Sequence, residues 1–354
     1  MPIIERFGTL LIMTKIKVAI NGFGRIGKCA ARIILLSHPE IELVAINDPR
    51  IDAASAAYSL MFDSSFGTFT GTVAHSADSL TVELGSKVSR IALFHEMDPL
   101  KLPWKDMQVD VVLECTGIFR DSVKASLHTQ AGAKKVIISA PAKDSDIATI
   151  VQSVNDIQAL KQMHQNNNGL IANASCTTNC VSPAIKVMMD NYEVTHISGI
   201  TVHAYTQSQM LQDGINAKGL RDGRAAAENL VPSKTGASDA VGLVLPAAKP
   251  LLTLSSVRAP VKTGSMVYLD FELKNAVSAE QVNATFLKAS QGDFAHVIEY
   301  STSELVSTDI IGNAHSCVVD SLLTTVHGNH VILTLWYDNE WGYSNRLVEL
   351  VAKI

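Results

Sequence analysis

The stretch Val18-Ala19-Ile20-Asn21-Gly22-Phe23-Gly24-Arg25-Ile26-Gly27 joins a short apolar run to a glycine pattern of the form G-x-G-x-x-G. Apolar residues at helical spacing follow it, at positions 29, 30, 33 and 34. Each glycine has a separate task here: Gly22 permits a tight turn, Gly24 lets the backbone approach a pyrophosphate, and Gly27 lets the helix pack closely on the strand. The stretch therefore predicts a strand, a turn and a helix whose N-terminus binds a dinucleotide.

A second apolar run, residues 41–47, has the composition of a strand and ends at Asp48, 21 residues after Gly27. An acid at this distance is expected to bind the hydroxyls of an adenosine ribose, and its charge would repel a 2′-phosphate. The alternative, an ordinary strand-to-helix turn, would not require Asp48 in this place. The sequence therefore predicts NAD as the cofactor.

Two further strands are predicted at residues 109–114 and 135–139, followed by Cys115-Thr116-Gly117 and Ala140-Pro141. In an open parallel sheet, ligands bind outside the carboxyl ends of the strands. We therefore expect these strand ends to line the cofactor site, in a Rossmann-type doubly wound parallel sheet of β-α-β units over residues 13–175.

The pattern changes after Cys180. Segments 197–203, 265–273 and 331–337 alternate or are rich in β-forming residues, which indicates an α+β catalytic domain with a mixed or antiparallel sheet over residues 176–342. Residues 205–235 are predicted to form a long ordered loop. Residues 345–353 have the spacing of an amphipathic helix.

Composition narrows the function classes. A chain of 354 residues suits two domains, and 47% hydrophobic with 18% charged residues is typical of a soluble globular protein. A net charge of -5 gives no electrostatic reason to expect nucleic acid or a membrane surface as partner. Five cysteines without a disulfide spacing point to the cytoplasm. Residues 1–12, which precede Met13, are expected to be a dispensable extension or the result of an upstream start.

The central octet Asn173-Ala174-Ser175-Cys176-Thr177-Thr178-Asn179-Cys180 carries the candidate nucleophile. Apolar residues at helical spacing follow it, so Cys176 is expected where a strand passes into a helix. Helix N-terminal N–H groups favour a thiolate and lower the pKa of the thiol. The alternative is a buried structural cysteine beside capping hydroxyls. A zinc site from Cys176 and Cys180 is not favoured, because no second ligand pair lies near them.

Cysteine chemistry needs a proton carrier, and His203, at the end of a predicted strand, is the best candidate. An anionic substrate would need a cation, and Arg258 stands among apolar neighbours where an unpaired charge is costly. Thr235-Gly236 could bind phosphate oxygens or cap a helix, and local sequence does not separate the two. Arg221 and Arg224 could be ordinary surface charges.

The chain resembles the phosphorylating glyceraldehyde-3-phosphate dehydrogenases over residues 13–354. The motifs that carry the resemblance are 21–27, 47–48, 114–117, 138–141, 174–180, 201–203, 235–237 and 336–344. It implies that the Cys176 thiolate attacks the aldehyde to form a hemithioacetal. His203 then takes the hydroxyl proton while hydride passes to the nicotinamide, and inorganic phosphate cleaves the thioester to an acyl phosphate.

The resemblance also implies which residues bind ligands. Thr206 and Arg258 would hold the phosphate of D-glyceraldehyde 3-phosphate. The attacking phosphate would be held by Ser175, Thr177, Thr235 and Gly236. The residues expected to contact NAD are Gly22, Gly24, Arg25, Ile26, Gly27, Asp48, Thr116, Gly117, Ser139, Asn339 and Tyr343. The family further implies a homotetramer with subunit contacts near residues 205–228, and a C-terminal helix, about 343–354, that packs back on the nucleotide-binding domain.

Some positions depart from the family pattern. Residues 62–67 read Phe-Asp-Ser-Ser-Phe-Gly where the family often has Tyr-Asp-Ser-x-His-Gly. Gly214-Ile215 replaces a proline common in NAD-specific members, which leaves the strictness of NAD over NADP open. Residues 252–256 also differ from usual members.

Two other functions are compatible with parts of the sequence. The paralogue that oxidises erythrose 4-phosphate shares the cysteine, the histidine and the nucleotide site, and residues 97–115 and 289–300 are somewhat similar to it. Segments 138–141, 205–206 and 235–236 favour the phosphorylating enzyme instead. A cofactor-binding protein retained for interaction would not need Cys176, His203 and Arg258 together.

Overall fold

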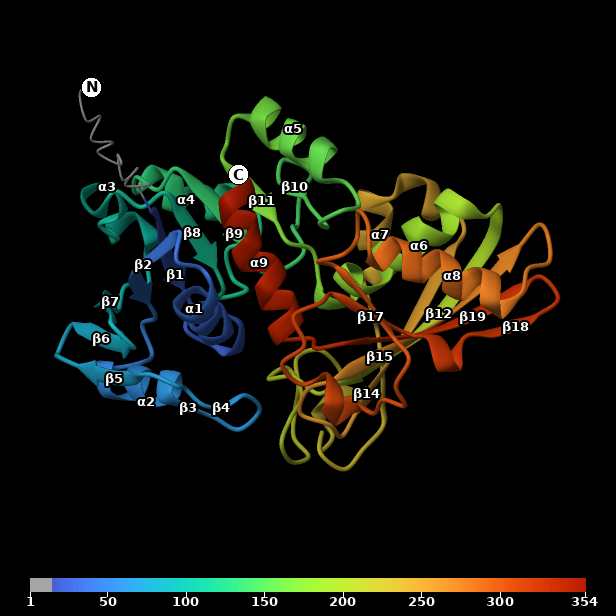
Figure 1. The fold of residues 1–354 in the computed structure, drawn as a ribbon. Coiled ribbons are helices and arrows are strands. Elements are labelled where there is room, and N and C mark those ends of the chain that lie inside the picture. The colour runs from blue at the N-terminus through green and yellow to red at the C-terminus, as the bar shows by residue number, and fades with distance from the viewer. Residues whose placement is uncertain (1–14) are drawn as a thin grey trace, which may run out of the picture.

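The computed structural model describes residues 15–354, which form two sheets side by side with the last helix between them (Figure 1). The predicted N-terminal extension, residues 1–12, lies outside the described residues. Within residues 15–354 there is no helix with the length and apolar character needed to cross a bilayer.

The first sheet has nine strands in the order β10-β11-β9-β8-β1-β2-β7-β6-β5. Each pair of adjacent strands from β10 to β7 in this order is parallel. The predicted doubly wound parallel sheet is confirmed. Its strands are β1 (Ile16–Asn21), β2 (Ile41–Asn47), β5 (Thr72–His75), β6 (Ser79–Leu84), β7 (Lys87–Phe94), β8 (Val111–Glu114), β9 (Lys135–Ile138), β10 (Ala148–Thr149) and β11 (Leu170–Ala172).

One edge of this sheet departs from the predicted alternation of strands and helices. β5, β6 and β7 form an antiparallel meander. A parallel crossover needs about a dozen residues, whereas only Gly85 and Ser86 separate β6 from β7. Gly85 has φ of +59°, which the tight turn requires. The short connections therefore impose antiparallel pairing.

Helices cover both faces of the first sheet. They are α1 (Arg25–Ser37), α2 (Ala53–Met61), α3 (Trp104–Met107), α4 (Ser122–Gln130) and α5 (Asp156–Asn166), and a small hairpin of β3 (Phe62–Asp63) and β4 (Gly67–Thr68) follows α2. Apolar residues of α1, such as Ile33 and Ile34, share one buried core with Val18 and Ile20 of β1. Leu347 of the last helix, α9 (Trp341–Lys353), belongs to the same core.

The second sheet has eight strands and is mixed, with the main order β13-β14-β12-β15-β19-β17-β16 and β18 paired to β19. This confirms the predicted mixed sheet. The strands are β12 (Val194–Ala204), β13 (Val231–Ser233), β14 (Leu252–Ala259), β15 (Ser265–Leu273), β16 (Ile298–Ser301), β17 (Cys317–Asp320), β18 (Thr325–His327) and β19 (His330–Tyr337). Three helices contribute to its core: α6 (Cys176–Asn191), α7 (Ala237–Val244) and α8 (Ala279–Ser290).

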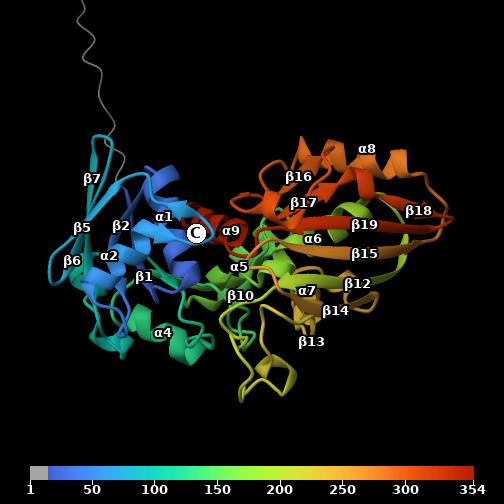
Figure 2. The ribbon, with the colours of Figure 1, turned by 90° about the horizontal axis from the view of Figure 1, so that it is seen from below.

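These helices lie on one face of the second sheet only. Seen from below, β19, β15 and β12 run side by side in front, with α6 behind them (Figure 2). Short 3-10 turns complete the chain: η1 (Pro99–Lys101), η2 (Arg221–Gly223), η3 (Pro246–Ala248), η4 (Ser307–Ile310) and η5 (Ser321–Leu323). The predicted loop 205–235 thus contains η2 and the short strand β13.

Asp338 fixes the junction between β19 and α9. Its side chain is 1% exposed. One carboxylate oxygen accepts from the backbone N–H groups of Glu340 and Trp341, both at 2.9 Å, and from the hydroxyl of Thr263 at 2.9 Å. The other accepts from Gly312 N at 2.8 Å. These bonds begin α9 directly after the second sheet and so return the chain to the first core.

Replacing Asp338 by alanine should lower the free energy of unfolding by about 3 kcal/mol or more, because buried donors lose a charged acceptor. Urea denaturation measures this loss. Asp309→Ala is a matched control, since this exposed carboxylate accepts from Val306 N at 2.8 Å at the start of η4. A loss for Asp338→Ala no greater than that of the control would contradict the role of this junction.

Candidate active site

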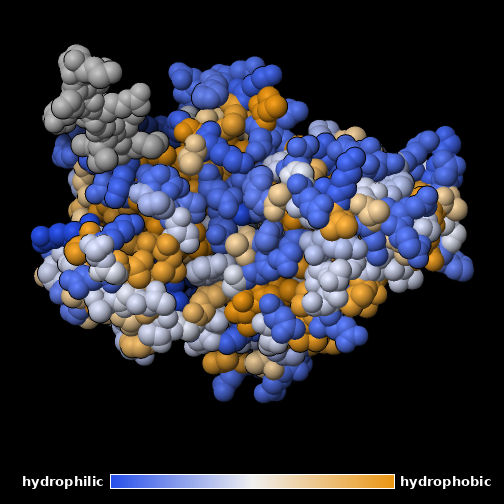
Figure 3. All heavy atoms as spheres, in the orientation of Figure 1, coloured by the Kyte–Doolittle hydropathy of each residue, from blue (hydrophilic) through white to orange (hydrophobic). Residues whose placement is uncertain are grey.

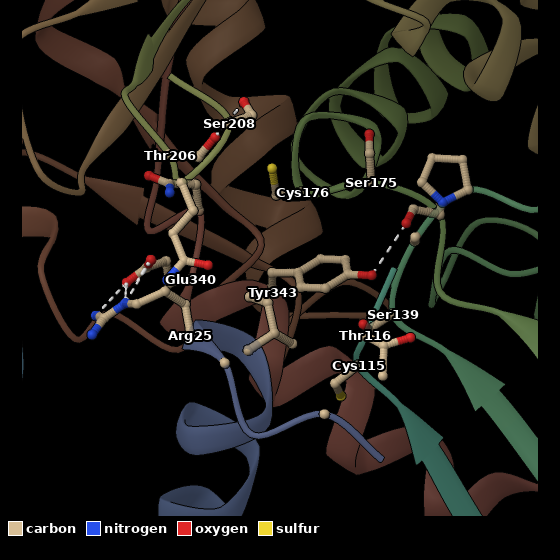
Figure 4. Close-up of a pocket in the computed structure, with 18 of the residues that line it drawn as sticks. Arg25, Cys115, Thr116, Ser139, Ser175, Cys176, Thr206, Ser208, Glu340 and Tyr343 are labelled. Carbon is tan, nitrogen blue, oxygen red and sulfur yellow. Dashed lines mark hydrogen bonds and ion pairs between the residues drawn. The ribbon is translucent and has the colours of Figure 1, made fainter. Parts of the chain in front are cut away.

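A cavity of about 410 Å³ lies where the carboxyl ends of the first sheet meet the start of α6 and the end of β12. Figure 4 shows Cys176 and Ser175 at one end, Arg25 with Glu340 on one side, and Thr116 and Ser139 on the other. Fourteen of the predicted site residues line it: Gly22, Gly24, Arg25, Ile26, Asp48, Thr116, Ser139, Ser175, Cys176, His203, Thr206, Arg258, Asn339 and Tyr343.

The start of α1 suits an anion. Gly24 is its N-cap residue, and no side chain within residues 15–354 caps the first N–H groups. A Cβ on Gly24 would meet no atom within 4 Å. At Gly27, which does not line the cavity, a Cβ would stand 2.1 Å from the carbonyl oxygen of Gly22. Gly24 therefore leaves room for a pyrophosphate at the positive end of the helix, and Gly27 serves helix packing.

Asp48 is held at the cavity wall by the backbone. Its carboxylate accepts from Phe23 N at 2.9 Å and from Arg50 N at 3.0 Å. Sequence analysis missed Arg50, whose exposed side chain also lines the cavity. The sequence feature that could have identified Arg50 is its position two residues after Asp48. The carboxylate in this orientation fits ribose hydroxyls.

A buried network positions Thr116 at the end of β8. The Thr116 N–H donates to Glu114 Oε1 at 2.8 Å, and its hydroxyl bonds the same oxygen. Glu114 Oε2 accepts from Asn21 at 2.5 Å and from Nε2 of His128 at 3.1 Å. The indole N–H of Trp104 donates to Nδ1 of His128 at 3.1 Å, which assigns the imidazole proton to Nε2. Buried side chains bound to Glu114 therefore fix the position of Thr116.

Asn339 reaches the cavity from the loop after β19. Its amide oxygen accepts from the hydroxyl of Ser265 at 2.8 Å. The amide nitrogen is then the end that remains to donate, which suits the carboxamide of a nicotinamide.

Cys176 is the first residue of α6, as the sequence predicts. Ser175 caps this helix, because its hydroxyl accepts from Thr178 N at 3.1 Å. Cys176 Sγ lies 3.3 Å from Nε2 of His203, near the end of β12. The predicted nucleophile and proton carrier are thus in contact.

The expected low pKa of Cys176 is wrong for this structure. Burial raises the pKa of the thiol above its ordinary value, although the Arg258 cation and hydrogen bonds from Thr177 oppose the rise. Burial, together with the nearby Arg258 cation, lowers the pKa of His203 to about 3. For Cys176, desolvation outweighs the groups that favour the thiolate, and burial favours the neutral form of both residues.

Nδ1 of His203 has two neighbours that favour opposite tautomers. Nη1 of Arg258 lies 2.5 Å away and can only donate, whereas the carbonyl oxygen of Ala204 lies 2.7 Å away and can only accept. With its proton on Nδ1, the ring donates to Ala204 and presents Nε2 to Cys176 as an acceptor. With its proton on Nε2, it accepts from Arg258 and donates toward the sulfur.

Arg258 and Thr206 both line the cavity and carry groups that could donate to a phosphate. Among the described residues, no group accepts from the buried Nε of Arg258. The Thr206 hydroxyl lies 3.0 Å from that of Ser208, which sequence analysis missed (Figure 4). A second recess of about 500 Å³ adjoins Arg258 and is lined by Lys218, Arg221 and Lys234. Arg221, weighed earlier as a surface charge, therefore belongs to a basic recess.

Five predicted site residues do not line the cavity. The hydroxyl of Thr177 lies 3.0 Å from that of Tyr337, in the core. Thr235 accepts from Ala237 N at 3.1 Å at the start of α7, where Gly236 is the N-cap residue. The Thr235 hydroxyl thus takes part in the start of α7, and the phosphate role expected of these two residues stays a prediction. The remaining two predicted site residues outside the cavity are Gly27 and Gly117. Of these, Gly117 has a φ of +71°.

Glu340 is a further cavity residue that sequence analysis missed, although it lies within motif 336–344. Its carboxylate pairs with Nη2 of Arg25 at 2.6 Å (Figure 4). Arg25 also pairs with Asp63 and lies 5.6 Å from the centre of the Phe66 ring. The departure at residues 62–67 therefore lies beside the cofactor side of the cavity.

Comparison with known proteins identifies two matching family models. Residues 16–122 match the NAD binding domain of glyceraldehyde 3-phosphate dehydrogenase, and residues 175–339 match its C-terminal domain. Glyceraldehyde-3-phosphate dehydrogenase 2 of Streptomyces avermitilis is 45% identical over 338 residues, 95% of this chain and 98% of the relative. The glyceraldehyde-3-phosphate dehydrogenase of Mycobacterium avium is 45% identical over 343 residues, 96% of this chain and 98% of the relative.

The low pKa of His203 predicts a pH dependence of stability. The unfolded chain binds a proton at this histidine below about pH 6.5, whereas the folded site takes it only near pH 3. The contribution of the neutral ring to stability is therefore complete above about pH 6.5 and is lost as the pH falls toward 3. Between pH 6 and 4, His203→Gln should lower the slope of unfolding free energy against pH by up to about 1.4 kcal/mol per unit.

Chemical denaturation at several pH values measures this slope. His75→Gln, at an exposed histidine, is the control and should keep the parental slope. Equal slopes for His203→Gln and the parent would show that His203 is not held neutral by the fold.

Proposed function

Because the chain belongs to the glyceraldehyde-3-phosphate dehydrogenase family, we propose that it oxidises D-glyceraldehyde 3-phosphate with NAD and inorganic phosphate to 1,3-bisphosphoglycerate, a step of glycolysis and gluconeogenesis. NAD is its cofactor. The observation that carries the proposal is the 3.3 Å contact between Cys176 Sγ and His203 Nε2 in a cavity that also holds the uncapped start of α1.

In the proposed first step, the Cys176 sulfur bonds to the aldehyde carbon. The thiol proton passes by way of His203 to the aldehyde oxygen, which gives a hemithioacetal. The tautomer needed has its proton on Nδ1, donating to Ala204, because Nε2 must be free to accept. Arg258 favours the other tautomer through its 2.5 Å contact with Nδ1. A substrate phosphate that draws the guanidinium toward itself would therefore favour the reactive tautomer.

In the second step, the hemithioacetal loses its hydride and its hydroxyl proton. Bound NAD would supply the hydride acceptor. Nε2 of His203 would take the proton, and a thioester on Cys176 would remain. Inorganic phosphate then attacks the thioester carbon, the carbon–sulfur bond breaks, and the imidazolium returns its proton to the leaving sulfur. The basic recess beside Arg258 supports the proposed approach of a second phosphate.

Oxidation of erythrose 4-phosphate is not favoured. The relatives at 45% identity carry the name glyceraldehyde-3-phosphate dehydrogenase. Among the described residues, Arg221 and Lys234 also line a recess next to Arg258. A hydrolytic enzyme would have no need of a second phosphate site.

We also propose a division of the chain into an NAD-binding domain, residues 13–175, and a catalytic domain, residues 176–342, with the helix at 343–354 returning to the first. The strands of the first sheet end at residue 172, and those of the second begin at residue 194. Leu347 packs in the core of the first sheet. For localisation we propose the cytoplasm, because all five cysteines are free.

Several exposed apolar groups support a proposed homotetramer. Ile200, Tyr268 and Ile332 stand on the uncovered face of the second sheet around a recess of about 690 Å³. In the loop that extends from the sheet in Figure 2, Ile215 is 99% and Leu220 93% exposed. Figure 3 shows hydrophobic atoms at the surface in the lower half of the molecule, where Figure 1 labels β14 and β15. Apolar groups exposed in such number are typical of protein interfaces.

The proposed activity predicts NADH formation from glyceraldehyde 3-phosphate that depends strongly on inorganic phosphate. Cys176→Ser should lower turnover by about a thousandfold or more, because a hydroxyl at this site cannot replace the thiol, while NAD binding by fluorescence titration remains. Substantial turnover in Cys176→Ser would exclude the covalent mechanism. Phosphate-independent activity on erythrose 4-phosphate, with none on the triose, would assign the paralogue's reaction.

The proposed assembly predicts that the protein sediments at the mass of four chains. Tyr268→Glu, which places a charge on the uncovered sheet face, should shift the equilibrium to smaller species in analytical ultracentrifugation. Tyr58→Glu is a matched control, since Tyr58 is 68% exposed on α2, away from the second sheet. A parent protein that sediments as a single chain at micromolar concentration would exclude the assembly.

A further inference from the structure

Side chains bind all three carbonyl groups that immediately precede Cys176, those of residues 173–175. Nδ2 of Asn179 donates to the first at 2.8 Å and to the third at 3.0 Å. The hydroxyl of Tyr343 donates to the middle one at 3.2 Å (Figure 4). The backbone between β11 and α6 is therefore held at each of its last three peptide groups.

This turn contains an unfavourable backbone conformation. Ala174 has φ of +52°, in the left-handed region, and its side chain is fully buried. A residue with a Cβ is disfavoured there, and such a conformation persists only where its surroundings impose it. Asn179 and Tyr343 bind the carbonyl group of Ala174 and those of the residues before and after it. These bonds are therefore placed to impose the left-handed conformation.

We propose that Asn179 is a positioning residue for the nucleophile: it holds the turn at residues 173–175 in the form that places Cys176 against His203. The inference deepens the proposed function and rests on it, because it concerns how the same cysteine is presented.

The path from Asn179 to the sulfur is short. Asn179 lies one helical turn after Ser175, and its backbone N–H also donates to the Ser175 carbonyl at 2.9 Å. Beyond Cys176, the bond between the hydroxyls of Thr177 and Tyr337 fixes the next residue of α6 at 3.0 Å. If the turn at residues 173–175 loosened, Cys176 would shift with the residues that precede it. A displacement of about 1 Å would break the contact between its sulfur and His203.

The side chain is specialised for donation. Asn179 is 1% exposed, and among the described residues nothing donates to its Oδ1. The asparagine thus serves the turn through its amide nitrogen alone. Asn191 near the other end of α6 offers a matched comparison, because its Nδ2 donates to the carbonyl four residues earlier, Val187, at 2.8 Å.

The first test is Asn179→Ala in the intact enzyme. We expect kcat to fall roughly ten- to a hundredfold, as for a misplaced reacting group, with the KM for NAD unchanged. Asn191→Ala removes a bond of the same kind and should retain the parental kcat. A parental kcat in Asn179→Ala would overturn the proposal. The proposal would also be overturned if activity fell only because fewer molecules were active, while each active site kept the parental turnover.

The second test is rescue. Glycine adopts the left-handed region without steric cost, so adding Ala174→Gly to Asn179→Ala should recover kcat by about threefold or more. The single variant Ala174→Gly completes the cycle. No recovery in the double variant, beyond the effect of Ala174→Gly alone, would show that Asn179 does not act through this turn.

A third readout separates this inference from the proposed activity. The rate at which iodoacetamide alkylates Cys176, followed by peptide mass spectrometry, reports the Cys176–His203 contact without any substrate. It should fall about tenfold in Asn179→Ala and recover with Ala174→Gly. If the parent enzyme lacks dehydrogenase activity but the alkylation rates follow this order, the proposed function fails and the positioning role stands.

Discussion

The parallel register between β12 and β14 sets the chemistry of the cavity. His203 pairs directly with Arg258 in this register. Directly paired residues present their side chains on the same face of a sheet, and a slip of one residue would turn one of them to the opposite face. The cation therefore stands beside the imidazole at a fixed distance. The start of α6 meets this pair, because Cys176 Sγ lies 3.3 Å from Nε2 of His203.

The consequence of this arrangement is that burial favours the neutral form of both Cys176 and His203. Burial raises the pKa of Cys176 and, with Arg258, lowers that of His203. A preformed ion pair would need protein dipoles to offset the loss of hydration, and here desolvation prevails. The guanidinium of Arg258 contacts the ring and lines the cavity at the same time. In the proposed mechanism, it would therefore couple substrate binding to proton transfer.

Features that depend on a few neighbouring residues were predictable from the sequence. The turn at Gly22, the close packing at Gly27 and the helix start at Cys176 follow from local spacing, and the structure has all three. Features set by distant contacts were not. The direction of the Thr177 hydroxyl depends on Tyr337, 160 residues away. The pKa of Cys176 depends on burial by elements from both sheets, whereas sequence reveals only the helix N-terminus that favours the thiolate. The antiparallel pairing at residues 72–94 could have been predicted from the short connections between its strands.

The two halves of the cavity stay together because the chain crosses between them more than once. Asp338 turns the chain from the second sheet into α9, and Leu347 of that helix packs in the core of the first sheet. The ion pair between Arg25 and Glu340 closes the same junction from the side of α1. A hydride can pass only between groups held a few ångströms apart. Since NAD would be bound by the first sheet and the substrate by the second, this junction sets the distance between them, and a rigid strand-to-helix connection serves better than a flexible linker.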